Sequence, residues 1–343
     1  MKARIWMAVI TLAALVSAPL SFAADDKTGI FETIRESSLS FTETTAAIDT
    51  AFADSALVLH GAHDVRVPDD KHQARVFVLT SPAYQAAAAN ESVRTVSAQV
   101  LRVAVYTQGD EQKTFVNMAN PVAHAMVFYA NSSNYDAMLN AAKAAASEIR
   151  ELVATVPGEA LGEQQEPMRT EKHYRKYKGD GPARMMAKFR TFEKSQLLIE
   201  EAAASDFDAT LEKVTAALAA STVSDASDSV GWETITQIRL RDDAVYIGLT
   251  NPYIEDKMVR INSRFRGDSK SELSPYPGVD HVAALPTDVL VLKDGDETLV
   301  LHYGQMWRMQ LYFWDSGYRA FTANVGVPSA IANSIKDTIR GDD

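Results

Sequence analysis

The chain has 343 residues, with 34 basic and 45 acidic side chains and a formal net charge of −11 at neutral pH. This acidic balance argues against nucleic acid as a partner and against a general affinity for anionic lipid. Cysteine is absent, which excludes a lipobox anchor, a disulfide framework, a thiolate nucleophile and a cysteine-ligated metal.

The first 23 residues have the pattern of a secretory signal peptide. Lys2 and Arg4 precede a short apolar run, and residues 21–23 form a small-x-small exit, which is typical of a signal peptide cut after Ala23. The apolar run is shorter than the roughly 20 residues that a membrane-spanning helix needs. We therefore expect a processed chain, periplasmic or secreted, with no integral membrane segment. Loss of Lys2 and Arg4 would deepen its net charge from −11 to −13.

The rest of the sequence contains two copies of one pattern. Residues 75–84 and 244–253 each read as a β-branched strand followed by Ser-Pro or Asn-Pro, the order expected where a strand leads into a helix. Before these steps, apolar residues at helical spacing predict helices from Phe41 and from Phe207.

Each strand–Pro–helix step is followed by a hairpin. Residues 101–106 and 113–118 flank a Gly-Asp turn, and residues 289–292 and 298–303 flank an Asp-Gly turn. Such turns between β-rich runs indicate β-hairpins.

Two aromatic runs come next, and the sequence predicts a further strand in each half, at residues 125–129 and 309–314. Each half then closes with a helix, beginning near Tyr135 and near Pro328. The offset between the copies grows from 166 to 186 along the chain, so the second copy carries an insertion, expected as a surface loop at residues 263–278.

The expected organisation is a signal peptide (1–23), a first module (24–158), a charged linker and helix (159–204) and a second module (205–343). Apolar residues of the linker fall on one side of a helix, namely Met185, Phe189, Phe192 and Ile199. Its basic stretch, residues 169–190, is typical of a solvated linker. The alternatives are a contact with an acidic partner, with a lipid headgroup surface or with the acidic modules of the chain itself.

Three places in the first copy resemble the domain of unknown function 302 family. They are His63-Asp64-Val65, the step at Pro82 and the strand over residues 101–106 that enters a Gly-Asp turn. The second copy keeps Asn251-Pro252 and Leu285-Pro286 but lacks the His-Asp step. The resemblance implies an α+β fold, with two tandem modules that are each an antiparallel sheet with helices on one face. It implies no activity.

The densest ligand-like cluster is His60-Gly61-Ala62-His63-Asp64. Imidazole and carboxylate suit zinc, copper or nickel, and Gly61 could let the chain fold both rings onto one ion. On an extended strand, however, His60 and His63 would point to opposite faces. A second, softer set suited to copper combines His124 with the thioethers of Met118 and Met126, although Met more often fills cores.

Aromatic residues concentrate near the end of the second copy. Tyr303, Trp307, Tyr312, Trp314 and Tyr318 could line an apolar pocket or a partner surface, or form a core face and a seam between the modules. Because Tyr129 matches Trp314 at an offset of 185, we expect at least one of the two to be buried between the modules.

No nucleophile elbow, phosphate loop, dinucleotide fingerprint or His-Glu-x-x-His motif is present in the sequence. The sequence therefore favours a non-enzymatic periplasmic binding or accessory protein for a small apolar ligand or a protein partner, acting through Tyr129, Trp307, Tyr312 and Trp314. The alternative is a metal-handling protein or metal-dependent enzyme that uses His60, His63, Asp64 and His124.

Overall fold

A computed structural model of the chain describes residues 27–69, 71–176, 179–180, 192–223, 230–265 and 278–341. The expected signal peptide lies outside these ranges, as do residues 266–277 of the expected insertion and much of the basic stretch 169–190. None of the helices in the described ranges has both the length and the apolar character needed to cross a bilayer.

The first module alternates strands and helices around one sheet. Its elements are β1 (Lys27–Ser37), α1 (Phe41–Ala53), β2 (Val58–Val65), β3 (Ala74–Thr80), α2 (Pro82–Ala87), the 3₁₀ helix η1 (Val93–Gln99), β4 (Val100–Gln108), β5 (Lys113–Ala119), α3 (Pro121–Phe128), α4 (Tyr135–Val153) and β6 (Gly158–Thr170). The short helix α5 (Glu171–Arg175) follows.

The second module repeats this order. Its elements are η3 (Phe192–Ser195), β7 (Gln196–Ala203), η4 (Ala204–Asp206), α6 (Phe207–Ala220), β8 (Glu233–Arg241), β9 (Ala244–Thr250), α7 (Pro252–Phe265), η5 (Val279–Ala284), β10 (Thr287–Asp294), β11 (Glu297–Tyr303), α8 (Gln305–Phe313), η6 (Trp314–Ser316), α9 (Gly317–Ala323) and α10 (Val327–Arg340).

The two antiparallel sheets have the same topology. The first has the strand order β2-β3-β4-β5-β1-β6, and the second has β8-β9-β10-β11-β7. Without β6 the two orders match strand for strand, with β1 corresponding to β7. The expected α+β fold of two sheet modules is confirmed.

Local signals explain why the strand–Pro–helix steps form in both copies. The Ser81 side chain accepts a hydrogen bond from the Tyr84 N–H, with Pro82 at the first helical position. In the second copy, Asn251 Oδ1 accepts from the Ile254 N–H at 2.9 Å. Ser and Asn satisfy backbone donors that the first turn of a helix leaves free, so these predicted helix starts are confirmed.

The strands predicted at residues 125–129 and 309–314 are wrong, because these residues belong mainly to α3 and α8. Asn120 caps α3 by accepting from the Val122 N–H, and Pro121 stands at its start. Nearly all of α3 and α8 is buried. A helix buried on every side has no polar stripe, and its sequence cannot be told from that of a buried strand by periodicity.

The linker and helix expected at residues 159–204 are also corrected. β6 pairs with β1 and β7 pairs with β11, so this segment adds a strand to each sheet. Phe192 lies in the 3₁₀ helix η3 and Ile199 lies in β7. β6 and β7 form because β1 and β11 have backbone groups that are free to hydrogen-bond with them. The spacing of apolar residues within the segment gives no sign of these distant partners.

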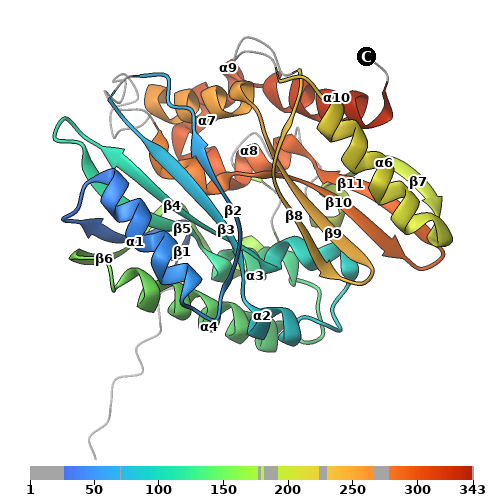
Figure 1. The fold of residues 1–343 in the computed structure, drawn as a ribbon, viewed down its shortest axis with the longest axis horizontal. Coiled ribbons are helices and arrows are strands. Elements are labelled where there is room, and N and C mark those ends of the chain that lie inside the picture. The colour runs from blue at the N-terminus through green and yellow to red at the C-terminus, as the bar shows by residue number, and fades with distance from the viewer. Residues whose placement is uncertain are drawn as a thin grey trace, which may run out of the picture.

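Each sheet has helices of its own module on one face. α1 and α4 pack on the first sheet, and α6 packs on the second; Figure 1 shows α2 and α4 on one side of the molecule and α7 and α10 on the opposite side. The other faces are covered reciprocally. η5 of the second module packs on β3, β4 and β5, and η1 of the first packs on β9 and β10. The modules therefore share one interior.

The modules also meet along the outer strands β2 and β8. Thr236 Oγ1 donates a hydrogen bond to the His60 carbonyl at 3.2 Å. A Cβ on Gly61 would lie 2.7 Å from the Ile235 carbonyl oxygen, closer than real Cβ contacts allow. Glycine at position 61 thus permits the close approach of two backbones, rather than the folding of two imidazoles around an ion.

We predict that Gly61→Ala lowers the free energy of unfolding by about 1–3 kcal/mol, because the added methyl forces β2 and β8 apart. Gly326→Ala is the matched control, since a Cβ there meets no atom within 4 Å. Urea titrations of the three proteins measure the difference. Equal stability of the two variants would show that the modules tolerate separation at Gly61.

Candidate functional site

The tyrosine of α8 enters the first module at the seam between the sheets. Tyr312 Oη accepts a hydrogen bond from Arg102 Nη2 at 2.8 Å and lies 2.9 Å from His124 Nε2. The Tyr312 ring is 5.8 Å from the ring of Phe31. All three neighbours belong to the first module, so Tyr312 joins the modules by polar and apolar contacts.

His124 is neutral in this arrangement. Burial, followed by the charges of Arg102 and Arg308, lowers the pKa of His124 well below its usual value. Arg102 Nη2 lies 3.1 Å from His124 Nε2. Because Arg102 only donates, this nitrogen is an acceptor, and His124 orients the hydroxyl of Tyr312 and the guanidinium of Arg102.

A second arginine, Arg308, also lies near Tyr312, with its guanidinium carbon 5.4 Å from the centroid of the Tyr312 ring. Arg308 Nη1 donates to Asp288 Oδ1 at 3.1 Å, and Ser97 Oγ donates to Asp288 Oδ2 at 2.9 Å. Burial raises the pKa of Asp288, although Arg308 and Ser97 act in the opposite direction. Ser97 is in η1, so this contact also joins the two modules.

The expected aromatic seam is present in part. Trp307 is buried and stacks on Tyr303 at 5.6 Å, and its ring lies 5.9 Å from Phe128 of the first module. Tyr129 has its aromatic contact with Tyr84 of its own module. Trp314 is half-buried against Phe321, also of its own module. Neither contact crosses the seam.

The metal-ligand candidates are dispersed. His60 Nε2 lies 2.8 Å from Thr80 Oγ1, and Asp64 pairs with Arg75 at 2.8 Å. His63 contacts Glu255, and His124 lies in the seam. Met118 and Met126 are core residues. Across the described ranges, no group of three or more His, Asp or Glu side chains is placed to hold a metal ion.

His63 instead connects the modules. Its Nε2 lies 2.7 Å from Glu255 Oε1 on α7. The Glu255 carboxylate also accepts from Thr250 Oγ1 at 2.7 Å and from the Arg66 N–H at 2.8 Å. Burial alone lowers the pKa of His63, but the hydrogen bond and charge of Glu255, with the charges of Glu233 and Asp64, outweigh it and raise this pKa.

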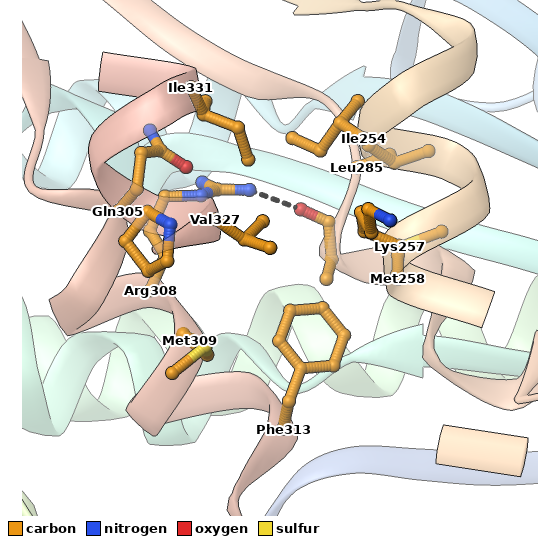
Figure 2. Close-up of a pocket in the computed structure, with 12 residues that line it drawn as sticks. Ile254, Lys257, Met258, Leu285, Gln305, Arg308, Met309, Phe313, Val327 and Ile331 are labelled. Atoms are coloured by element: carbon orange, nitrogen blue, oxygen red, sulfur yellow. Dashed lines mark hydrogen bonds between the residues drawn. The ribbon is translucent and has the colours of Figure 1, made fainter. Parts of the chain in front are cut away.

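An apolar pocket lies in the second module, among α7, α8, α10 and the end of η5. It encloses about 460 Å³ of unfilled space including its open mouth. Figure 2 shows side chains of α7 facing those of α8 and α10 across this space. The lining is largely apolar: Ile254, Met258, Ala284, Leu285, Met309, Phe313, Val327, Pro328 and Ile331, with Lys257, Gln305 and Arg308.

The corresponding region of the first module is filled. The starts of α3 and α8 align Tyr129 with Phe313, one residue before the Trp314 expected from the sequence, and Tyr84 corresponds to Ile254. Both tyrosines are buried, with their rings 6.5 Å apart. α2 packs directly on α4. Among the described residues, the equivalent helices α7 and α10 make no such extensive contact, so the smaller Ile254 leaves space between them.

Two of the three polar side chains of the pocket are held by other groups. Arg308 Nη2 donates to the carbonyls of Ala284 at 2.7 Å and Pro286 at 3.3 Å. Gln305 Nε2 donates to Thr287 Oγ1 and to the Tyr303 carbonyl, both at 3.1 Å. Lys257 is partly exposed, with Nζ 5.2 Å from the centroid of the Tyr253 ring.

The sequence reading overlooked Arg102, Asp288 and Arg308. A signal for the first was available, because Arg102 interrupts an otherwise apolar strand, Val100–Gln108, that is buried for most of its length. A charge within a buried strand needs a buried partner. No comparable signal marks the pocket, whose side chains are ordinary core types.

No family model, curated protein or solved structure matches this chain. The resemblance to the domain of unknown function 302 family therefore stays a prediction.

We predict that His63 stabilises the protein most at acidic pH. Its pKa is raised above 6.5 in the folded state, so its contribution is complete below the unfolded pKa and is lost as the pH rises through the folded pKa. His63→Gln should therefore cost more stability at about pH 5.5 than at about pH 8.5, measured by urea unfolding.

His60→Gln is the control for this comparison, because burial lowers the pKa of His60. A lowered pKa destabilises the fold at acidic pH, so the cost of this change should vary with pH in the opposite direction. If the stability cost of both variants changed with pH in the same direction, the stabilisation of protonated His63 by Glu255 would be contradicted.

Proposed function

We propose that this chain is an exported binding protein that takes a small apolar ligand into the pocket of its second module. The observation that carries the proposal is the apolar pocket among α7, α8 and α10, which opens to solvent. Apolar pockets with a few placed polar groups are the usual form of small-molecule sites.

The lining indicates the chemistry of the ligand. Among the described residues, no acidic side chain lines the pocket, and the charged groups there are Lys257 and Arg308. Since Arg308 is held by carbonyls and Asp288, the partly exposed Lys257 is placed to meet a hydrogen-bond acceptor or a negative group. Met258 and Met309 are flexible side chains that can adapt to ligands of different shape.

The duplication provides an internal comparison that supports this assignment. In the first module, the same helices enclose Tyr84 and Tyr129. A frame that can be closed with large side chains is left open in the second copy. The fold therefore does not require this open space. A pocket that the fold does not require is what we expect if the second copy binds a ligand there.

A binding experiment with N-phenyl-1-naphthylamine, a neutral fluorescent apolar probe, tests the pocket. Val327 lines the pocket and is half-buried, whereas Val325 is 40% exposed and does not line it. We predict saturable binding by the wild type and at least about tenfold weaker binding by Val327→Trp, because the indole occupies the space; tenfold is about 1.4 kcal/mol. Val325→Trp should bind as the wild type does.

Thermal melting of both tryptophan variants controls for loss of folding. Non-saturable binding by the wild type, or equal affinity in a folded Val327→Trp variant, would refute a ligand site in this pocket. Extraction and mass spectrometry of protein purified without detergent would then identify the natural ligand class.

Export is the second part of the proposal and rests on the signal-peptide pattern of residues 1–23. We predict that the protein recovered from its native host begins at Ala24, as cleavage after Ala23 requires. N-terminal sequencing of the purified protein gives the answer directly. Recovery of Met1 would exclude processing and the exported location that depends on it.

A further inference from the structure

The seam between the modules buries unbalanced charge. Arg102 and Arg308 are each only 6% exposed, and Asp288 is 3% exposed. These two guanidinium groups and one carboxylate line a common cavity together with Ser97, Tyr246 and Tyr303. His124 adds no charge because its pKa is strongly lowered. The groups around this cavity therefore carry one excess positive charge.

Asp288 does not neutralise both arginines. One of its oxygens accepts from Arg308 and the other accepts from Ser97. Within the part of the chain that the structure describes, the hydrogen-bond partners of Arg102 are all neutral: the Ala284 carbonyl, His124 Nε2 and Tyr312 Oη. A buried charge without an ionic partner is costly, and a counterion at the cavity would remove that cost.

Two of the residues that line the cavity also have a polar atom with no geometric hydrogen bond. By distance and angle, Arg102 Nε and Tyr303 Oη are buried without a hydrogen-bond partner within the described structure. The side chains of Ser97 and Gln196 are near enough to the Tyr303 hydroxyl to lower its pKa, although burial raises this pKa more. Nearly all buried polar groups in proteins are hydrogen-bonded. Both groups can donate, and one belongs to each module. Two residues with a free donor group, one from each module, thus line one small cavity whose charged groups carry a positive excess. Such a lining suits an anion.

We propose that the cavity lined by Arg102, Tyr246, Tyr303 and Arg308 binds a small monovalent anion of the halide class, with chloride as the physiological form. One negative charge balances the excess charge of the lining groups. The anion would accept from Arg102 Nε and Tyr303 Oη, so it would link β4 of the first module to β11 of the second. This site is separate from the apolar pocket, and its test does not depend on ligand binding.

Bromide provides the direct test, because it replaces chloride and scatters X-rays anomalously. Crystals of the full processed chain grown with sodium bromide should show an anomalous peak within hydrogen-bond distance of Arg102 Nε and Tyr303 Oη. In solution, the melting temperature should rise with sodium chloride relative to sodium gluconate at equal ionic strength, by about 2 °C or more once the anion is at a hundred times its Kd.

Three variants separate the site from general salt effects. Arg102→Gln should abolish the chloride-specific rise, and Tyr303→Phe should require about tenfold more chloride, since a hydrogen bond to a charged group is lost. Tyr84→Phe is the matched control: its hydroxyl is equally buried and has no hydrogen-bond partner, but it does not line the cavity, so the chloride response should be unchanged.

The Tyr303→Phe variant keeps the test valid if Arg102→Gln fails to fold. Absence of the bromide peak would overturn the proposal and leave water as the occupant. Equal chloride dependence of Tyr303→Phe and Tyr84→Phe would also overturn it, even with a bromide peak, because occupancy would then occur only at crystal concentrations.

Discussion

Coverage of the second face of each sheet is the constraint on which the structure depends. One layer of helices covers only one face of a sheet, and the apolar side chains on the other face need a partner. Each module supplies a 3₁₀ helix to the sheet of the other, η5 to the first and η1 to the second. Gly61 at the contact of β2 with β8, the contacts of Tyr312 with the first module and the buried charges of the seam all lie where the two modules meet.

The two modules share the same order of strands and helices but differ in the side chains at equivalent positions. Helices α3 and α8 occupy equivalent places, yet His124 in the first corresponds to Arg308 in the second. Likewise, Arg102 on β4 corresponds to Asp288 on β10, so the copies contribute opposite charges from matching strands. An exact repeat would place like charges together at the pseudo-symmetric seam. The difference in side chains between the two copies therefore reduces charge repulsion between the modules, and it also leaves the apolar pocket in the second module.

Much of the fold could be predicted because its signals are local. Ser81-Pro82 and Asn251-Pro252 mark helix starts, and the Asp-Gly turn after Lys293 marks a hairpin, each within a few residues. The closing helices and the matched order of the two copies followed from the same signals. These features need no knowledge of distant contacts.

The remaining features depend on contacts between distant parts of the chain. The helices α3 and α8 are buried on nearly all sides, so their sequences lack the polar stripe that would identify them. The strands β6 and β7 exist because β1 and β11 offer free edges. Arg102 and Tyr312 meet across 210 positions, and no spacing rule pairs them. The metal hypothesis at His60 and His63 relied on sequence proximity, whereas each ring has a different partner.

The acidic side chains on the last strand of each sheet affect whether copies of the chain associate in concentrated solution. The outer strands β2 and β8 lie against each other, whereas β6 and β7 end their sheets. An unpaired strand edge can recruit a strand from another molecule and start aggregation. Both ending strands carry carboxylates, at Glu159, Glu163, Glu166, Glu200 and Glu201. A second copy approaching edge to edge would bring these negative charges together, so acidity limits self-association where the backbone is open.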